Sequence, residues 1–520
     1  MAFLAWIRFS TPSPNEVPSL SRTKISGAVA AVTALTLLAA CTPSSSDSSA
    51  TRDGDSADVT TSPAPVFRVG AVDDTGKSEK DAEATGSPSA SAAPTAAPSG
   101  ETVDSGSSID VEAGKRISLS VEGAALKDVK ITDADHPRIT TDPGTFFDAK
   151  GTALTTEDAK AGGLTSPDET ASPDKSATSD ASPSPDATDS AAPTESPTAS
   201  ATDPATDAPV TAPDEATSWT SRFDLVASST YDLTATATTP DGKDHEFTTS
   251  AKVDDAGGDP MAVRTVLADD QTVGVAAPII LTFGSKVAKK YRDDVEHRLT
   301  VDVTDMDGKK REVEGSWAWL PDDPESRLHF RPKDYWPANS KVSVDAPLKN
   351  VPMAEDRTGK NDLSIDFEVG REQIVEASAK THRMVVTRDG KKVMDFPTSL
   401  GSAKAPSYNG VHVVMSKHSD YTMTSARWGY TTPVKWAVRI HNNGEFVHAA
   451  PWSVGQQGSA NVSHGCINLS TARAKEYYDS ALYGDPVIVK DSSVNLSTDD
   501  SDISDWVYDW DDWKKMSALS

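Results

Sequence analysis

Two long segments of low complexity set the strongest limit on what this chain can fold into. Residues 42–106 and 155–216 consist mainly of Ser, Thr, Ala, Pro, Gly and Asp, with few large apolar side chains. Such segments cannot bury enough apolar surface to offset the conformational entropy that ordering would cost. We therefore predict that 42–106 is a disordered tether and that 155–216 is a disordered insertion within a folded module.

Much of the acidic charge of the chain lies in these same segments. The 520 residues include 50 Lys and Arg against 78 Asp and Glu, a formal net charge of −28. Much of this excess lies in the Ser/Asp/Pro/Thr-rich stretches, where it solvates flexible chain. A negative balance argues against nucleic acid or an anionic membrane surface as a direct partner. The length of the chain predicts several domains.

The first segment has the features of an export signal. Arg22 and Lys24 precede a small, apolar run at 25–40, which ends in Leu-Ala-Ala directly before Cys41. This order resembles a bacterial lipoprotein lipobox, in which the cysteine is diacylated and becomes the mature N-terminus. The alternative is a plain signal peptide or membrane anchor, although the run is short for a span of about 20 residues. We expect 1–41 to be a lipoprotein signal peptide, and the rest of the chain to be extracytoplasmic and held at the outer face of the membrane by lipid alone.

Alternation of apolar and polar residues predicts two β-sandwich modules. Residues 107–254 carry strand-like runs on both sides of the 155–216 insertion, which favours one interrupted sandwich over two unrelated half-folded segments. Residues 261–369 carry six further runs at the spacing of an immunoglobulin-like sandwich. The aromatic residues of this second module fit core and interface packing, with sugar binding as the alternative.

Strand patterns continue through 370–491. Asp389-Gly390 between two apolar runs predicts a tight hairpin, and 471–482 is the one clear helical stretch. The remaining segment, 492–520, has Trp506, Trp510 and Trp513 spaced four and three apart, so all three share one helical face. We expect this tail to pack on the preceding domain.

The chemistry of the chain concentrates at 448–468. Cys466 is one of only two cysteines, and His464 and His448 precede it by two and eighteen residues. A thiolate is the reactive form of cysteine, and a nearby imidazole can generate it, so these residues predict a nucleophilic acyl-transfer site. Gly465 allows a tight backbone that could direct amides at an oxyanion. A zinc site formed by the same cysteine and histidines is the other chemical option.

This stretch resembles the signature of the L,D-transpeptidase catalytic domain. The family pattern is a histidine, a short variable segment, and then Ser/Thr-His-Gly-Cys, a variable residue and Asn; His448 and the run 463–468, Ser-His-Gly-Cys-Ile-Asn, match every fixed position. The runs at 314–320 and 330–338 also resemble the immunoglobulin-like module that precedes this domain in actinobacterial members. The resemblance implies a mainly β protein: two immunoglobulin-like sandwiches, then a β-rich catalytic domain at 370–491 with a Trp-rich tail.

The resemblance also implies roles for individual residues. Cys466 would be the nucleophile, His448 its base, oriented by the backbone carbonyl of Ala449, and His464 a supporting or oxyanion-side residue, with a purely structural histidine as the alternative. Gly465, Ser463 and Asn468 are assigned to the oxyanion and motif loop, and Cys41 is assigned to lipidation. The residues assigned to substrate binding are Tyr430, Ala449, Tyr421, Met415 and Trp452, with simple packing as the alternative for Trp452.

Three functions follow from these observations. The first is a peptidoglycan L,D-transpeptidase that forms 3→3 cross-links between stem peptides, releases D-Ala and reacts with carbapenems, as the resemblance implies. The second uses the same nucleophile with water, a protein or a D-amino acid as acceptor. The third is a non-catalytic wall-binding lipoprotein. None of them calls for a metal or cofactor, and we expect a monomer with stem peptides as its partners.

Overall fold

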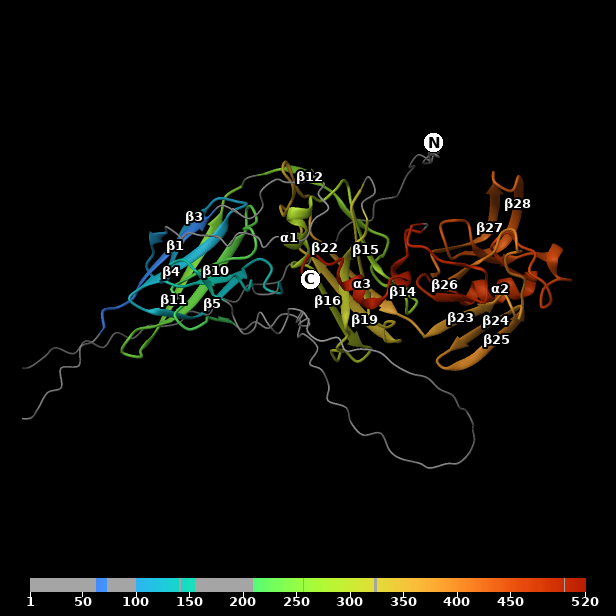
Figure 1. The fold of residues 1–520 in the computed structure, drawn as a ribbon, viewed down its shortest axis with the longest axis horizontal. Coiled ribbons are helices and arrows are strands. Elements are labelled where there is room, and N and C mark those ends of the chain that lie inside the picture. Colours follow the sequence, from blue (N-terminus) through green and yellow to red (C-terminus); the bar gives the residue numbers. More distant parts are fainter. Residues whose placement is uncertain are drawn as a thin grey trace, which may run out of the picture. The chain divides into compact units, whose positions relative to one another are not determined.

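The computed structural model describes residues 62–72, 100–139, 142–154, 209–255, 257–321, 325–499 and 501–520. The predicted signal peptide with Cys41, most of the predicted tether and nearly all of the low-complexity insertion lie outside these residues. Within them the chain is mainly β, as predicted (Figure 1). No helix in these ranges is both long and apolar enough to cross a bilayer.

The first module is a sandwich of two sheets whose inner faces share one apolar core. Leu119 and Trp219 from one sheet and Leu233 and Phe247 from the other are all buried in that core. One sheet has the order β2 (Glu101–Thr102), β1 (Val66–Val72), β4 (Arg116–Glu122), β9 (Ser218–Thr220), β6 (Thr145–Phe147) and β7 (Ala153–Leu154). The other has the order β3 (Ser107–Val111), β11 (Asp244–Val253), β10 (Thr230–Thr238), β5 (Ala125–Asp133) and β8 (Val210–Thr211).

Strand β1 corrects the prediction that 42–106 is a tether throughout. All seven of its residues pair with β4, and Phe67 and Val69 enter the core. The composition of the surrounding sequence concealed this short alternating run, which is stable because it adds a strand to an existing sheet. Strand β8 likewise lies inside the predicted insertion, so that prediction is also wrong at its C-terminal end.

The second module is a second sandwich with a small side sheet. Trp336 and Phe283 are fully buried between its two main sheets. One main sheet has the order β13 (Val263–Thr265), β15 (Ile279–Phe283), β18 (Arg327–Pro332) and β17 (Gly315–Trp319), and the other has the order β14 (Gln271–Val273), β22 (Leu363–Val369), β19 (Ser340–Ala346) and β16 (Thr300–Asp305). The side sheet has the order β12 (Asp259–Met261), β21 (Arg357–Gly359) and β20 (Pro352–Ala354). The helices of this module are η2 (Lys289–Tyr291) and α1 (Arg292–Glu296).

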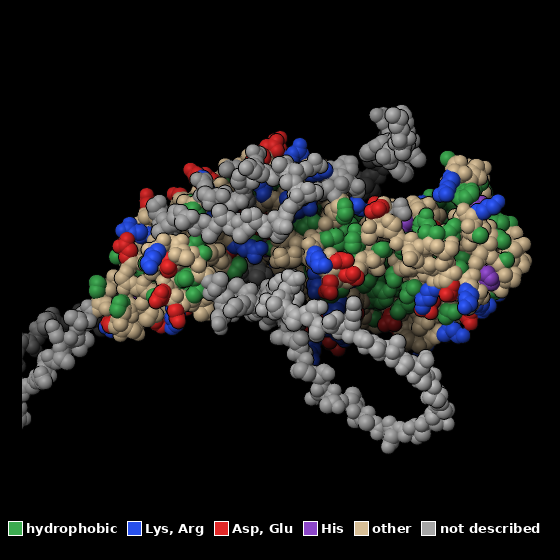
Figure 2. All heavy atoms as spheres, viewed as in Figure 1, with side chains coloured by type: hydrophobic (Ala, Val, Ile, Leu, Met, Phe, Trp, Pro, Cys, Tyr) green, Lys and Arg blue, Asp and Glu red, His purple; other side chains and the backbone are tan. Residues whose placement is uncertain are grey.

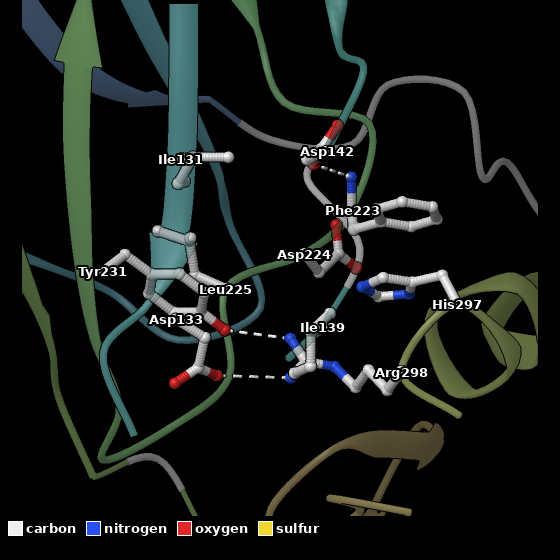
Figure 3. Close-up of a pocket in the computed structure, with 10 residues that line it drawn as sticks. All are labelled: Ile131, Asp133, Ile139, Asp142, Phe223, Asp224, Leu225, Tyr231, His297 and Arg298. Atoms are coloured by element: carbon white, nitrogen blue, oxygen red, sulfur yellow. Dashed lines mark hydrogen bonds and ion pairs between the residues drawn. The ribbon is translucent and has the colours of Figure 1, made fainter. Parts of the chain in front are cut away.

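Buried polar groups join the two sandwich modules. Arg298, which follows α1, donates to the phenol oxygen of Tyr231 at 2.9 Å and to a carboxylate oxygen of Asp133 at 3.4 Å (Figure 3). The backbone N–H of Asp224 in the first module donates to a carboxylate oxygen of Asp294 in α1 at 3.1 Å. A buried charge without its partner is costly, so these pairs favour one docking geometry.

The third domain, 370–491, consists of two sheets and a helix. The hairpin predicted at Asp389-Gly390 is confirmed, with both residues at positive φ. The predicted helix is α2 (Thr471–Ser480), preceded by η3 (Pro451–Ser453). One sheet has the order β25 (Lys391–Pro397), β24 (Arg383–Arg388), β23 (Gln373–Ser378), β31 (Pro486–Lys490) and β26 (Tyr408–Val413), and β32 (Val494–Asn495) from the following tail joins its edge. The other sheet has the order β27 (Ser416–Ser425), β28 (Tyr430–Arg439), β29 (Phe446–Ala449) and β30 (Ile467–Leu469).

A close backbone contact connects the second module to the third domain. The N–H of Gly274 donates to the Tyr483 carbonyl at 2.7 Å, and the N–H of Ala276 donates to the Gly484 carbonyl at 2.9 Å. Gly484 has a φ of +87°, and a Cβ added there would lie 2.3 Å from the Cβ of Ala277. Only glycine therefore permits this approach.

The tail contains η4 (Asp505–Val507) and α3 (Trp510–Lys514). The expectation that it packs on the third domain is wrong for Trp510 and Trp513, whose indole N–H groups donate to Glu314 and Ser316 of the second module. The Arg331 guanidinium of that module lies over the rings of Trp506, Trp510 and Trp513 at 4.7, 5.1 and 5.0 Å. The first part of the tail does contact the third domain: β32 pairs with β26, and Ile503 and Trp506 pack on a cluster that includes Val413. Arg331 belongs to β18, and its buried positive charge attracts aromatic rings more strongly than an apolar side chain would.

Acidic and basic side chains lie interspersed over the described surface seen in Figure 2. This mixture matches the expectation that the acidic excess of the chain is concentrated in its low-complexity segments and not on one binding face.

Candidate active site

The sheet of the third domain brings the two ends of the 448–468 motif together. Strands β29 and β30 pair in parallel, and His448 lies opposite Asn468. Val447 and Ile467 are fully buried, so their shared apolar face holds the pairing in register. The chain between the strands turns through η3, which begins with Pro451 at a helical position suited to proline.

Cys466 ends the motif loop just before β30 and is 6% exposed. Its thiol donates to the Gly444 carbonyl at 3.5 Å. Burial raises the pKa of this thiol to about 12, a backbone hydrogen bond from Phe446 lowers it in part, and the Glu445 carboxyl adds to the rise. The thiol is therefore protonated in the resting protein and needs a base to become a nucleophile.

His448 supplies an imidazole in the form that such a base requires. Its Nδ1 lies 2.9 Å from the Ala449 carbonyl, as predicted, so Nδ1 carries the proton and Nε2 is left to accept one. Burial lowers the pKa of His448 to about 4, although the Ala449 contact and the Asn468 side chain oppose this shift. The resting pair is thus a neutral thiol and a neutral imidazole.

Both groups open into one cavity of about 450 Å³. One wall comes from the β27–β28 hairpin, and the other comes from the motif segment. The lining residues are Met423, Tyr430, Thr432 and Val434 from the hairpin, and His448, Trp452, Val462, Ser463, His464, Cys466 and Asn468 from the motif segment.

The loop residues around Cys466 hold one another in place. The Gly465 N–H donates to the Ser463 hydroxyl at 3.2 Å, and that hydroxyl donates to the Cys466 carbonyl at 2.6 Å. Asn468 donates to the Ser453 hydroxyl at 3.2 Å. Because the Gly465 amide already has an acceptor, the amide of Cys466 is the better candidate for binding an oxyanion.

The aromatic candidates divide between the cavity and the core. Tyr430 and the exposed Trp452 both line the cavity, and the rings of Tyr430 and Trp428 lie 5.4 and 5.2 Å from that of His464. Tyr421 instead packs on the Phe446 ring at 5.0 Å, deeper in the hairpin than the cavity wall.

The assignment of Met415 to substrate binding is wrong. Met415 precedes β27 and packs against Ile280 and Val413 at the second module. Met423 is the methionine that lines the cavity, and sequence reasoning missed it together with Thr432, Val434, Val462 and Trp428. Thr432 and Val434 alternate with Tyr430 along β28, so the period of two was the available indication.

No group of three or more His, Cys, Asp or Glu side chains is placed to hold a metal ion in the part of the chain that the structure describes. The zinc alternative for Cys466, His448 and His464 therefore has no support in their geometry.

Comparisons with known proteins match two parts of the chain. A family model described as a bacterial Ig domain matches residues 201–352, and one described as the L,D-transpeptidase catalytic domain matches residues 372–489. The chain is 50% identical to L,D-transpeptidase 5 of Mycobacterium tuberculosis over 258 residues, which are 49% of this chain and 55% of that protein. The match therefore spans about half the length of this curated relative.

Two further relatives are covered more completely. L,D-transpeptidase 1 of M. tuberculosis is 34% identical over 230 residues, which are 43% of this chain and 82% of that protein. A solved structure of an L,D-transpeptidase from Mycobacterium smegmatis is 32% identical, and the match covers 45% of this chain and 100% of that one with a TM-score of 0.36.

Proposed function

This chain belongs to the L,D-transpeptidase family, and from that premise we propose that it is a peptidoglycan L,D-transpeptidase with Cys466 as its nucleophile. The observation that carries the proposal is the pair formed by the Cys466 thiol and the His448 imidazole in one cavity, with His448 held by the Ala449 carbonyl. Such a pair performs acyl transfer, because the imidazole can take the thiol proton as the sulfur attacks a carbonyl.

The reaction proceeds in two halves. In the first, His448 Nε2 takes the thiol proton while Sγ bonds to the carbonyl carbon at the L-centre of the third residue of a tetrapeptide stem. The Cys466 backbone N–H donates a hydrogen bond to the oxyanion formed there. The intermediate then collapses, the C–N bond to D-Ala breaks, and His448 gives its proton to the departing amine, leaving a thioester on Cys466.

In the second half, a side-chain amine of another stem attacks the thioester carbonyl. His448 removes a proton from this amine, the C–S bond breaks, and the thiolate regains the proton. The product is a 3→3 cross-link, and the free enzyme is restored. Tyr430 and Trp452, which line opposite walls of the cavity, would contact the donor stem. His464, flanked by two aromatic rings, would hold the motif loop.

Water as the acceptor is the second candidate. The cavity is open, and Trp452 at its mouth is 59% exposed, so the thioester is accessible to solvent. Hydrolysis would make the enzyme an L,D-carboxypeptidase with the same first half-reaction. Only the product distinguishes the two activities.

Product analysis tests the proposal directly. We would incubate the full chain with a disaccharide-tetrapeptide and follow products by mass spectrometry. We expect dimers that have lost one D-Ala and, as the family resemblance implies, a carbapenem adduct on Cys466. Tripeptide monomers alone would identify the carboxypeptidase. Failure to form any product or adduct would overturn the enzymatic function and leave a wall-binding role.

At acidic pH, the fall of kcat/KM should reveal the pKa of the buried base His448. Because burial lowers the pKa of His448 from 6.5 to about 4, its imidazole stays neutral well below pH 6.5. We expect kcat/KM to fall only as pH approaches about 4, since kcat/KM follows the free enzyme. Steady-state rates between pH 4 and 8 check this, and a midpoint between 6 and 7 would show that His448 is solvated.

The wall substrate also implies a location. We propose that the protein acts outside the cytoplasmic membrane, anchored by lipid on Cys41, on the basis of the lipobox-like sequence around that residue. The mass of the mature N-terminus measured from cells tests this, because an unacylated N-terminus would exclude the anchor.

A further inference from the structure

A buried carboxyl lies directly beneath the motif loop. Glu445 follows Gly444, whose carbonyl accepts the Cys466 thiol, and Glu445 is only 4% exposed. A Cβ added to Gly465 would lie 3.3 Å from Glu445 Oε1, and Gly465 has a φ of +123°. The carboxyl therefore packs against the backbone of the residue that precedes the nucleophile.

The polar contacts of Glu445 leave one oxygen facing a histidine. Oε1 accepts the N–H of Tyr408 at 3.1 Å. Oε2 lies 3.6 Å from Nδ1 of His412, and neither of these two buried atoms has a hydrogen-bond partner within the described ranges. His412 Nε2 is 2.8 Å from the Tyr408 carbonyl, so Nε2 carries a proton and donates it there.

These contacts require one proton between the two facing atoms. An ionised carboxylate and a neutral imidazole would set two lone pairs against each other without solvent, which is costly in a buried site. A proton held between Oε2 and Nδ1 removes that cost and leaves the pair with no net charge. Burial acts in the same direction, because it raises the pKa of Glu445 to about 8 and lowers that of His412 to about 4.

The charge of this pair bears on the nucleophile. Around the pair, His441 has its ring 5.6 Å from that of His412, and the Ile440 backbone faces His412. On the other side, Glu445 and Arg439 both act on Cys466: the Glu445 charge raises the pKa of the thiol and the Arg439 charge lowers it. A carboxylate beneath the loop would oppose formation of the Cys466 thiolate, as like charges do.

We propose that Glu445 is a positioning residue for the nucleophile: its protonated carboxyl, which faces His412, supports the backbone at Gly465 and keeps negative charge away from Cys466. This inference rests on the proposed function only in taking Cys466 as the nucleophile. The reactivity of the Cys466 thiol should therefore depend on pH, because loss of the shared proton places a carboxylate beneath it.

Two substitutions distinguish the support that Glu445 gives to the loop from the effect of its charge. In Glu445→Gln the amide oxygen can still accept from Tyr408 and the amide N–H can donate to His412, but the group cannot ionise. Glu445→Ala removes both contacts. We would measure the rate at which iodoacetamide alkylates Cys466 in the full chain from pH 6.5 to 9.5, with peptide mass spectrometry to distinguish Cys466 from Cys41.

We expect Glu445→Ala to slow alkylation at pH 6.5 by about tenfold, and Glu445→Gln to restore most of that rate. At pH 9.5 the Gln variant should react roughly threefold faster than the unaltered protein, because only the unaltered protein carries the carboxylate. Glu376→Gln is the matched control, since Glu376 is half exposed and pairs with Lys490 at the surface.

The outcomes separate this inference from the proposed function. A Gln variant that is as slow as the Ala variant at pH 6.5 would show that the charged carboxylate is needed, and identical pH profiles for Gln and unaltered protein would show that the proton is irrelevant. Either result overturns the inference. Alkylation needs no peptidoglycan, so failure of the product assay would leave this test intact. Thermal unfolding of each variant confirms that it is folded.

Discussion

Replacing Cys466 with serine should lower cross-link formation by roughly 10⁴-fold or more, because the reaction depends on a thiolate that a hydroxyl cannot match. Burial already raises the pKa of the thiol to about 12. A hydroxyl in the same place is a still weaker acid, and the neutral His448 would have to remove its proton. The measurement is single-turnover release of D-Ala by the serine variant beside unaltered protein.

The substitution should leave the fold intact. Serine is close in size to cysteine, and its hydroxyl can donate to the Gly444 carbonyl as the thiol does. An equal loss in Cys466→Ala and Cys466→Ser, with unfolding temperatures close to that of the unaltered protein, would assign the whole effect to the nucleophile. A serine variant that keeps a tenth of the activity would show that another group attacks the stem.

Replacing Trp513 with alanine should cost about 3–5 kcal/mol in the free energy of unfolding of the second module and its tail. The Trp513 side chain is 0% exposed and packs against Ala318 and Leu320. Its indole N–H donates to the Ser316 carbonyl at 2.9 Å. Alanine would leave a cavity, an unpaired carbonyl and a weaker contact with the Arg331 guanidinium.

Denaturant unfolding should be followed domain by domain, because a chain with several domains need not unfold in one step. Trp452→Ala is the matched control: this tryptophan is 59% exposed, so its removal should change stability little. Unchanged transitions in Trp513→Ala would show that the tail does not hold the second module. A buried pair next to it, His329 Nδ1 with both oxygens of Asp505 at 3.1 Å, gives the tail a second attachment.

The sequence predicted the parts of the site that are continuous in the chain. Cys466, His448 and the Ala449 carbonyl were assigned because they lie within one fixed motif. Cys466 and His448 line one cavity, and the Ala449 carbonyl contacts His448 Nδ1. The hairpin residues were predicted less well. Tyr430 was identified, but Met415 was chosen in place of Met423. Both methionines come shortly before Tyr430 in the chain, and only the pairing of β27 with β28 shows which of them faces the cavity.

Local pattern also determined most of the fold. Period-two alternation identified many of the longer strands of the two sandwiches and of the third domain, because a strand with one buried face alternates apolar and polar residues. Strand β1 was missed because its seven residues lie in a segment of low-complexity composition, and it is stabilised by pairing with β4 and β2 and by burial of Phe67 and Val69.

The sequence by itself therefore determined the class of fold, and it predicted the order of domains and the candidate nucleophile with its base, because periodicity and motif are properties of neighbouring residues. The tertiary structure decided the rest: that burial keeps the thiol and imidazole neutral, that Glu445 meets His412 beneath the loop, and that the tail reaches Arg331. Desolvation and proximity between segments far apart in the chain produce these effects, and both exist only once the chain has folded.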